Sequence, residues 1–148
     1  AWVVHRARRV GDGAALALLA DPAYDPSIEV LLPEGAPEGT AAAGSLSAST
    51  AEVTSYAPER IVVHADASAP GWLVLGEWTY PGWQAWVDGR RVKIHRAHYA
   101  LRAVPLAAGS HVIEFRYRPL TVYAGAATSV VTVFAVGIVG VFLRRQKK

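Results

Sequence analysis

Residues 111–118 read HVIEFRYR, and this stretch decides the fold class. Apolar Ile113, Phe115 and Tyr117 alternate with charged side chains at positions 114, 116 and 118. A period of two puts the two sets on opposite faces of a β-strand, which predicts an antiparallel sheet with one face on a core and one in water. Pro119 ends the strand, because proline has no N–H to donate to a sheet.

Six segments upstream show the same alternation or short apolar runs, with turn residues between them. They are residues 53–56, 61–65, 72–80, 83–87, 92–95 and 99–104. Seven strands at this spacing predict a mainly β chain, folded as an antiparallel β-sandwich of the jelly-roll or immunoglobulin-like kind.

Three dipeptides predict the turns between these strands. Asp88-Gly89 lies between two apolar runs and predicts a β-hairpin with a primed turn, in which Gly89 supplies the positive φ. Pro81-Gly82 and Ala108-Gly109 predict two further turns.

The N-terminal part is less regular. Its pattern predicts a strand over residues 1–10, a short helix over 13–20 capped by Asp12, and a strand over 27–32. Residues 33–50 hold two Pro, three Gly and a run of small side chains. This composition predicts a linker or a long surface loop.

The C-terminal part has a different composition, with no charge over residues 120–143. A helix of this length spans roughly 36 Å, more than the approximately 30 Å of a bilayer's hydrocarbon core. This predicts a transmembrane helix, which we favour over a buried globular helix because the latter seldom runs so far without a polar stripe. Gly125 and Ser129 share one of its faces and are candidates for close packing on other helices. The alternative is that small residues are simply frequent in membrane helices.

Basic residues follow the apolar segment directly: Arg144, Arg145, Lys147 and Lys148. Such residues mark the cytoplasmic end of a span, so residues 1–119 are predicted to be extracytoplasmic. The tail holds four of the 15 Lys+Arg, which leaves eleven basic residues against all 12 acidic ones in the body. The pI near 9.5 therefore describes the tail, and the body has no basic stripe of the kind that binds nucleic acid.

Few residues of the body suggest catalysis. The chain has no cysteine, which excludes thiolate catalysis and Cys-ligated zinc. Glu77 and Asp88 are the carboxylates considered as a hydrolytic pair, but such a pair must face across about 5 to 9 Å, and Asp88 already has a role in the turn. His95 and His98 are three apart, which on a strand points them to opposite faces. We therefore expect no metal and no cofactor.

Five aromatic residues fall within fifteen positions: Trp72, Trp78, Tyr80, Trp83 and Trp86. Alternation puts Trp72, Trp78 and Tyr80 on one face, the predicted core. It leaves Trp86 with Gln84 on the opposite face. Trp86 is therefore the candidate exposed aromatic, suited to stacking on a sugar ring of an envelope glycan.

Five motifs follow one another in the second half of the chain: YAPERI (56–61), GWLVL (71–75), YPGWQAWVDG (80–89), AHYALR (97–102), and AGSH running on to FRYRP (108–119). In this order they resemble the C-terminal region of YfhO-type bacterial membrane proteins, over roughly residues 50–130. The resemblance implies a large multi-pass protein similar to lipid-phosphate-sugar glycosyltransferases, with a β-rich extracytoplasmic module before its last helix. It also implies a role in glycosylating cell-envelope polymers, with an undecaprenyl-phosphate-linked sugar as donor.

In that class of glycosyltransferase the catalytic acid lies on an early extracytoplasmic loop, which this chain does not contain. No catalytic residue is therefore carried over. The opening Ala-Trp-Val-Val, with no Met and no signal sequence, predicts a fragment of a longer protein or a processed chain.

The leading hypothesis is a non-catalytic module and anchor in the bacterial cell membrane, packed on the other transmembrane helices of its protein. One alternative is a single-pass anchored β-sandwich that binds carbohydrate or a protein partner. The other is a structural lid on a membrane domain.

Overall fold

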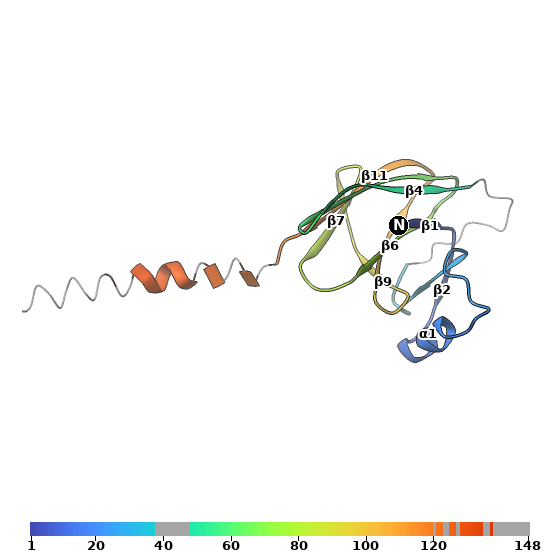
Figure 1. Ribbon diagram of the computed structural model, residues 1–148, viewed down its shortest axis with the longest axis horizontal. Coiled ribbons are helices and arrows are strands. Elements are labelled where there is room, and N and C mark those ends of the chain that lie inside the picture. The colour runs from blue at the N-terminus through green and yellow to red at the C-terminus, as the bar shows by residue number, and fades with distance from the viewer. Residues whose placement is uncertain (38–47, 120, 123–124, 127, 135–136, 138–148) are drawn as a thin grey trace, which may run out of the picture. The chain divides into compact units, whose positions relative to one another are not determined.

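The computed structural model describes residues 1–37, 48–119, 121–122, 125–126, 128–134 and 137 (Figure 1). The chain divides into two compact units, Ala1–Arg118 and Pro119–Lys148. The predicted basic tail lies outside the described residues, as do parts of the predicted loop 33–50 and of the predicted span 120–143.

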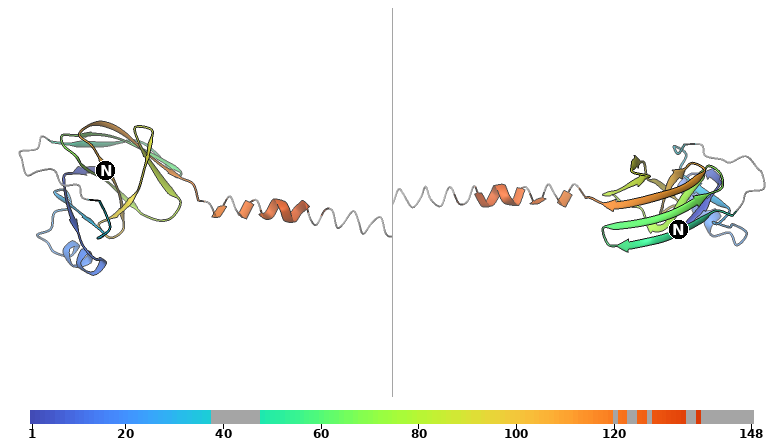
Figure 2. Two further views of the ribbon diagram at one scale, coloured as in Figure 1. Left: turned by 180° about the vertical axis from the view of Figure 1, so that it is seen from behind. Right: turned by 90° about the horizontal axis from the view of Figure 1, so that it is seen from above.

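The first unit is mainly β, and both of its large sheets are antiparallel, which confirms the prediction at this level (Figure 1). One sheet holds, in spatial order, β1 (Trp2–Val4), β6 (Gly71–Trp78), β10 (Leu101–Leu106) and β9 (His95–Ala97). The other holds β4 (Thr50–Ala57), β5 (Arg60–Ala67), β11 (Gly109–Tyr117), β7 (Trp83–Val87) and β8 (Arg90–Val92). The right-hand view of Figure 2 shows β4, β5 and β11 side by side.

The larger core combines side chains of both antiparallel sheets. The four-stranded sheet supplies Leu73, Leu75, Val104 and Leu106, and the five-stranded sheet supplies Ile61, Val63, Ala65, Ala67, Ala85, Ile113 and Phe115. The alternation in β11 accounts for its share, because Ile113 and Phe115 are fully buried while Glu114 between them turns to the opposite face.

A second core cluster contains the alternate residues of β6, Trp72 and Val74, with Val4, Val30, Leu32, Ala36, Ala97 and Ala103. Val30 and Leu32 belong to β3 (Glu29–Leu32), which pairs in parallel with β2 (Arg6–Arg9). Strand β6 is therefore covered on both faces, and residues 72–75 form a continuous buried run.

The prediction of one strand over residues 1–10 was wrong. The segment forms β1 and β2, which join different sheets and break at His5. The imidazole of His5 contacts Ser49 Oγ at 2.8 Å and the Pro70 carbonyl oxygen at 3.2 Å. Alternation cannot show that the chain changes from one sheet to another at this point, because β1 and β2 have the same period of two.

The short helix is present as α1 (Asp12–Leu19), but its predicted cap was wrong. Gly11 occupies the N-cap position, and no side chain makes a capping hydrogen bond. Asp12 instead lies in the first turn and pairs with Arg96. A carboxylate there still interacts favourably with the positive end of the helix dipole.

The described residues of the second unit that have regular structure are helical: 121–122, 125–126, 128–134 and 137. No helix among the residues described here reaches the length and apolar character needed to cross a membrane. Ser129 Oγ donates a hydrogen bond to the Gly125 carbonyl at 3.0 Å, and Thr132 Oγ1 donates to the Thr128 carbonyl at 2.9 Å.

Candidate functional site

The face of the five-stranded sheet opposite the larger core carries a polar cluster around Glu114. The strand register sets Glu114 between Trp86 on β7 and Val62 on β5. The same register sets Arg116 opposite Arg60. This cluster contains Trp86, the one binding residue that the sequence suggested.

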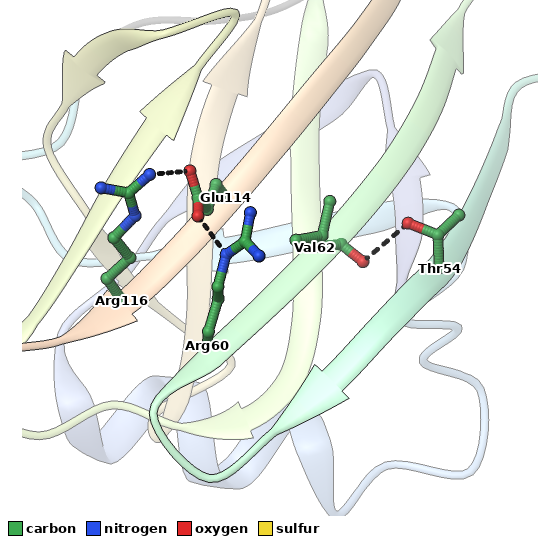
Figure 3. A network of polar contacts seen from close by, with 5 residues as sticks. All are labelled: Thr54, Arg60, Val62, Glu114 and Arg116. Atoms are coloured by element: carbon green, nitrogen blue, oxygen red, sulfur yellow. Dashed lines mark hydrogen bonds and ion pairs between the residues drawn. The ribbon is translucent and has the colours of Figure 1, made fainter.

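Two arginines hold the Glu114 carboxylate (Figure 3). Arg116 Nη2 donates to Oε2 at 2.5 Å, and Arg60 Nε donates to Oε1. The Glu114 side chain is 16% exposed, against 57% for Arg60 and 39% for Arg116. The hydrogen bond from Arg116, supported by the one from Arg60 and opposed by burial, lowers the pKa of Glu114 from 4.5 to about 2. Glu114 is therefore ionised at neutral pH and is not suited to act as a general acid.

Trp86 is half-buried and belongs to this cluster rather than standing alone. The guanidinium carbon of Arg116 lies 4.9 Å from the centre of the Trp86 ring, which is a cation–π contact. One face of the indole is thus covered by Arg116. The remaining accessible part of the ring is the surface that a sugar or a partner side chain would contact.

Strand β4, an edge of this sheet, carries a bulge beside the cluster. The register shifts between Val53 and Ser55, so Thr54 is the extra residue. Thr54 Oγ1 lies 3.4 Å from the Val62 carbonyl oxygen (Figure 3). A bulge increases the local twist, which makes an edge strand a poorer template for pairing with another chain.

Asp88 and Gly89 have φ angles of 51° and 77°, the backbone of a type I′ turn. The Asp88 carboxylate accepts a hydrogen bond from the Val112 N–H at 2.9 Å and contacts His111 Nδ1 at 2.6 Å. These bonds, the one to His111 first, lower the pKa of Asp88. Asp88 therefore ties the hairpin to β11.

A second predicted turn, Pro81-Gly82, lies where β7 begins. Gly82 has a φ of 106°, and its carbonyl accepts a hydrogen bond from the Arg118 N–H at 2.7 Å. This turn therefore holds the C-terminal end of the first unit.

Glu77, the second carboxylate of the hydrolytic pair considered above, has a different partner from Asp88. Its Oε1 accepts a hydrogen bond from the Tyr56 hydroxyl at 2.6 Å. Each of the two carboxylates therefore has its own structural hydrogen-bond partner.

His95 and His98 are both buried. His95 packs edge-on against Trp72, with ring centres 5.2 Å apart, and His98 Nδ1 lies 3.3 Å from the Tyr24 hydroxyl. Burial lowers the pKa of both imidazoles, so both are neutral at physiological pH. In the described ranges, no three His, Asp or Glu side chains are grouped so that they could hold a metal ion.

The predicted burial of Trp78 and Tyr80 was wrong, because these side chains are 73% and 50% exposed, whereas Trp72 is 1% exposed. The register between β6 and β10 shifts at Leu101, where Trp78 pairs. The second core cluster includes Trp72 and Val74 but not Trp78. Alternation shows the face to which a side chain points. Whether that face is covered by a second layer along the whole strand depends on the tertiary fold, and the second core cluster does not reach Trp78.

A second cluster, which the sequence analysis missed, surrounds Arg102 at 1% exposure. Arg102 Nε donates to the Trp78 carbonyl at 2.9 Å. Its guanidinium carbon lies 3.9 Å from the centre of the Trp83 ring and 5.8 Å from that of Tyr80. The Tyr117 ring contacts both, with centres 5.4 and 5.6 Å away. Burial lowers the pKa of Arg102. The sequence signal that could have revealed this buried residue is an arginine within the otherwise apolar segment LRAVPL, residues 101–106.

Two surface hollows, each of about 190 Å³, lie elsewhere. One is lined by His64, Ala65, Asp66, Ser110, His111 and Val112, and the other by Arg6, Arg8, Ala23, Tyr24, Asp25, Ile28 and Glu29. Trp86 borders neither of these hollows.

Comparison with known proteins gives one match. The model of the family described as "Bacterial membrane protein YfhO" matches residues 39–129, a range that includes both clusters and extends into the second unit. No curated protein and no solved structure matches the chain.

Proposed function

This chain belongs to the YfhO family of bacterial membrane proteins, and we propose that it forms a non-catalytic extracytoplasmic module near the C-terminus of such a protein, together with its last membrane anchor. In this proposal the two antiparallel sheets form a β-sandwich within residues 1–119, residues 120–143 span the membrane, and residues 144–148 lie in the cytoplasm. The whole protein would use a lipid-phosphate-linked sugar to glycosylate cell-envelope polymers.

The membrane anchor is supported by the apolar side chains that the second unit exposes. Val131, Val133 and Phe134 are 66%, 72% and 68% exposed. The hydroxyls of Ser129 and Thr132 donate to carbonyls four residues earlier, so these polar groups need no water. Helical segments with uncovered apolar side chains and internally bonded hydroxyls suit a bilayer, and residues 120–143 are uncharged throughout.

Packing of this anchor on other transmembrane helices is assigned to Gly125 and Ser129. A Cβ atom built on Gly125 would meet nothing within 4 Å, so the space beside this residue is open to a neighbouring helix. Small residues at a spacing of four allow such close approach in lipid.

The non-catalytic role is supported by the carboxylates, because each candidate already has a structural partner. Glu114 is held by Arg60 and Arg116, Asp88 by His111 and Val112, and Glu77 by Tyr56. A general acid at neutral pH needs a raised pKa, whereas those of Glu114 and Asp88 are lowered.

Two experiments test this proposal. A reporter that fluoresces only in the cytoplasm, fused after Lys148, is expected to give signal, and a dark fusion that is correctly inserted would reverse the topology. The chain in lipid vesicles is also expected to leave an undecaprenyl-phosphate-linked sugar unchanged. Turnover by this chain alone would refute the non-catalytic role.

A second candidate function is the binding of an envelope glycan or a protein partner at the Trp86 surface. The observation in its favour is a half-buried indole beside Arg116, on the face of the five-stranded sheet opposite the larger core. Titration with envelope oligosaccharides would then change the tryptophan emission of the wild type but not of Trp86→Ala. An unchanged wild-type emission would exclude the glycan.

A further inference from the structure

We propose that Tyr56, Trp78 and Tyr80 form a lipid-facing aromatic rim, which lies among the headgroups of the extracytoplasmic leaflet. Their side chains are 66%, 73% and 50% exposed, the largest values for aromatic residues among the described part of the first unit. The inference rests on the anchor of the proposed function.

The three residues lie at the same end of the first unit. The Tyr56 hydroxyl donates to Glu77, the residue that precedes Trp78. The Trp78 carbonyl accepts a hydrogen bond from Arg102, whose guanidinium faces the Tyr80 ring. These contacts bring the three residues to one end of the first unit, although Glu77 and Trp78 point to opposite faces of β6.

The aromatic rim is also supported from beneath. The buried Arg102 guanidinium lies against the Trp83 ring and faces the Tyr80 ring, and Tyr80 packs edge-on against both Trp83 and Tyr117. The exposure of Tyr80 therefore belongs to a packed cluster rather than to a freely rotating side chain. An exposed aromatic that is held in place loses little side-chain entropy when it binds.

The short connection to the uncharged segment keeps this end of the first unit close to the membrane. Strand β11 ends at Tyr117, within the same cluster, and the uncharged segment begins at residue 120. Three residues reach at most about 10 Å, whereas the headgroup layer of one leaflet is roughly 5–8 Å thick. If residues 120–143 span the bilayer, Tyr117 and its neighbours are tethered within or just above the headgroups.

The residue types fit this position. Trp and Tyr combine an apolar ring with a polar N–H or O–H, and they concentrate at the membrane–water interface for that reason. Arg118, exposed beside the cluster, adds a cation for lipid phosphates. A lipid interface accounts for three large exposed rings at one end of the unit.

The absence of cysteine from the chain allows a direct test with single-cysteine labels. Trp78→Cys and Tyr56→Cys, in the full chain, would carry an environment-sensitive fluorophore. Val112→Cys is the matched control, because Val112 is 45% exposed and lies on β11 itself, five residues or about 17 Å before Tyr117. Each variant is reconstituted into phosphatidylethanolamine–phosphatidylglycerol vesicles with nitroxides on the lipid headgroups.

We expect the labels at 78 and 56 to lose most of their emission to the headgroup nitroxides, and the label at 112 to keep its emission. Equal quenching at 78 and 112, or none at 78 and 56, would overturn the inference. A label at 78 that is shifted to the blue but not quenched would also overturn it, because another protein surface would then cover the aromatic rim.

A fourth variant, Phe134→Cys, reports on the anchor by itself, with nitroxides on the acyl chains. If this label is quenched while the label at 78 is not, the anchor stands and the aromatic rim does not face lipid. If the label at 134 is not quenched, the anchor fails, and the inference fails with it.

Discussion

Replacing Glu114 with glutamine tests the cluster on the outer face of the five-stranded sheet. The substitution keeps the shape of the side chain and an oxygen acceptor but removes the charge that Arg60 and Arg116 share. We expect the variant to fold and to have a lower free energy of unfolding at neutral pH, because two arginines would face each other without the carboxylate between them.

The size of the effect follows from the pKa and from exposure. A fall in the pKa of Glu114 from 4.5 to about 2 corresponds to about 3 kcal/mol of stabilisation of the folded state, when the carboxyl has its ordinary pKa in the unfolded chain. The two arginine side chains are 57% and 39% exposed, so water and salt screen the pair. We therefore expect a loss of about 1–2 kcal/mol for Glu114→Gln at pH 7.

The pH dependence has a definite sign. The folded-state pKa lies below the unfolded value of 4.5, so the stabilisation is complete well above pH 4.5 and is lost as the pH falls toward 2. Urea denaturation in detergent micelles, followed by tryptophan emission, would measure the gap between wild type and variant. The gap should be constant from pH 6 to 8 and should narrow below pH 4.5.

Glu52→Gln is the matched control, because Glu52 is an exposed carboxylate on the edge strand β4 of the same sheet. It should change the free energy of unfolding by no more than about 0.5 kcal/mol. A Glu114→Gln variant as stable as the control at pH 7, or a gap that widens in acid, would refute the reasoning.

Two further predictions concern glycines, and both are measured as shifts in the urea midpoint. Gly71→Ala should destabilise the fold by about 2 kcal/mol or more, because its Cβ would lie 2.4 Å from the Val4 carbonyl oxygen. Gly76→Ala is the control and should be nearly neutral, because its Cβ would meet only the Trp2 ring, at 3.8 Å. Equal midpoints for these two variants would contradict the close approach of β1 to β6. Gly89→Val should cost on the order of 1 kcal/mol or more from backbone strain alone, since φ is 77° and no atom lies within 4 Å of the added Cβ. An unchanged midpoint would contradict the positive φ.

Local rules predicted much of the fold because they act over a few residues. The period of two in residues 111–118 identified which side chains of β11 enter the core, and strand β7 has the predicted bounds 83–87. The break at His5 was not predictable in this way, because it depends on which sheet each half joins. The continuous burial of residues 72–75 likewise needs the second layer, which is made from the distant strand β3.

The sequence suggested Trp86 as the exposed aromatic, whereas the structure has it half-buried, and the sequence could not identify its neighbours. Arg116 is thirty residues away in sequence and reaches the ring only through the pairing of β7 with β11. The pairing also brings Glu114 opposite Trp86. Such contacts depend on which strands pair and in which register. A pattern of polar and apolar residues shows the faces of each strand but does not show which strand is its neighbour.

Several departures from local rules lie at the end of the first unit where β11 finishes. Trp78 is exposed although its strand pattern predicts burial, and Arg102 is buried although it is charged. Arg102 Nη1 and Trp83 Nε1 are buried without a hydrogen-bond partner among the described residues. A folded chain tolerates such features where another requirement offsets their cost, and functional surfaces are where they gather. Placing this end at the membrane interface gives the exposed indole surroundings that suit both its apolar ring and its polar N–H, and the buried arginine then acts as the rigid support that keeps Tyr80 and Trp83 in position.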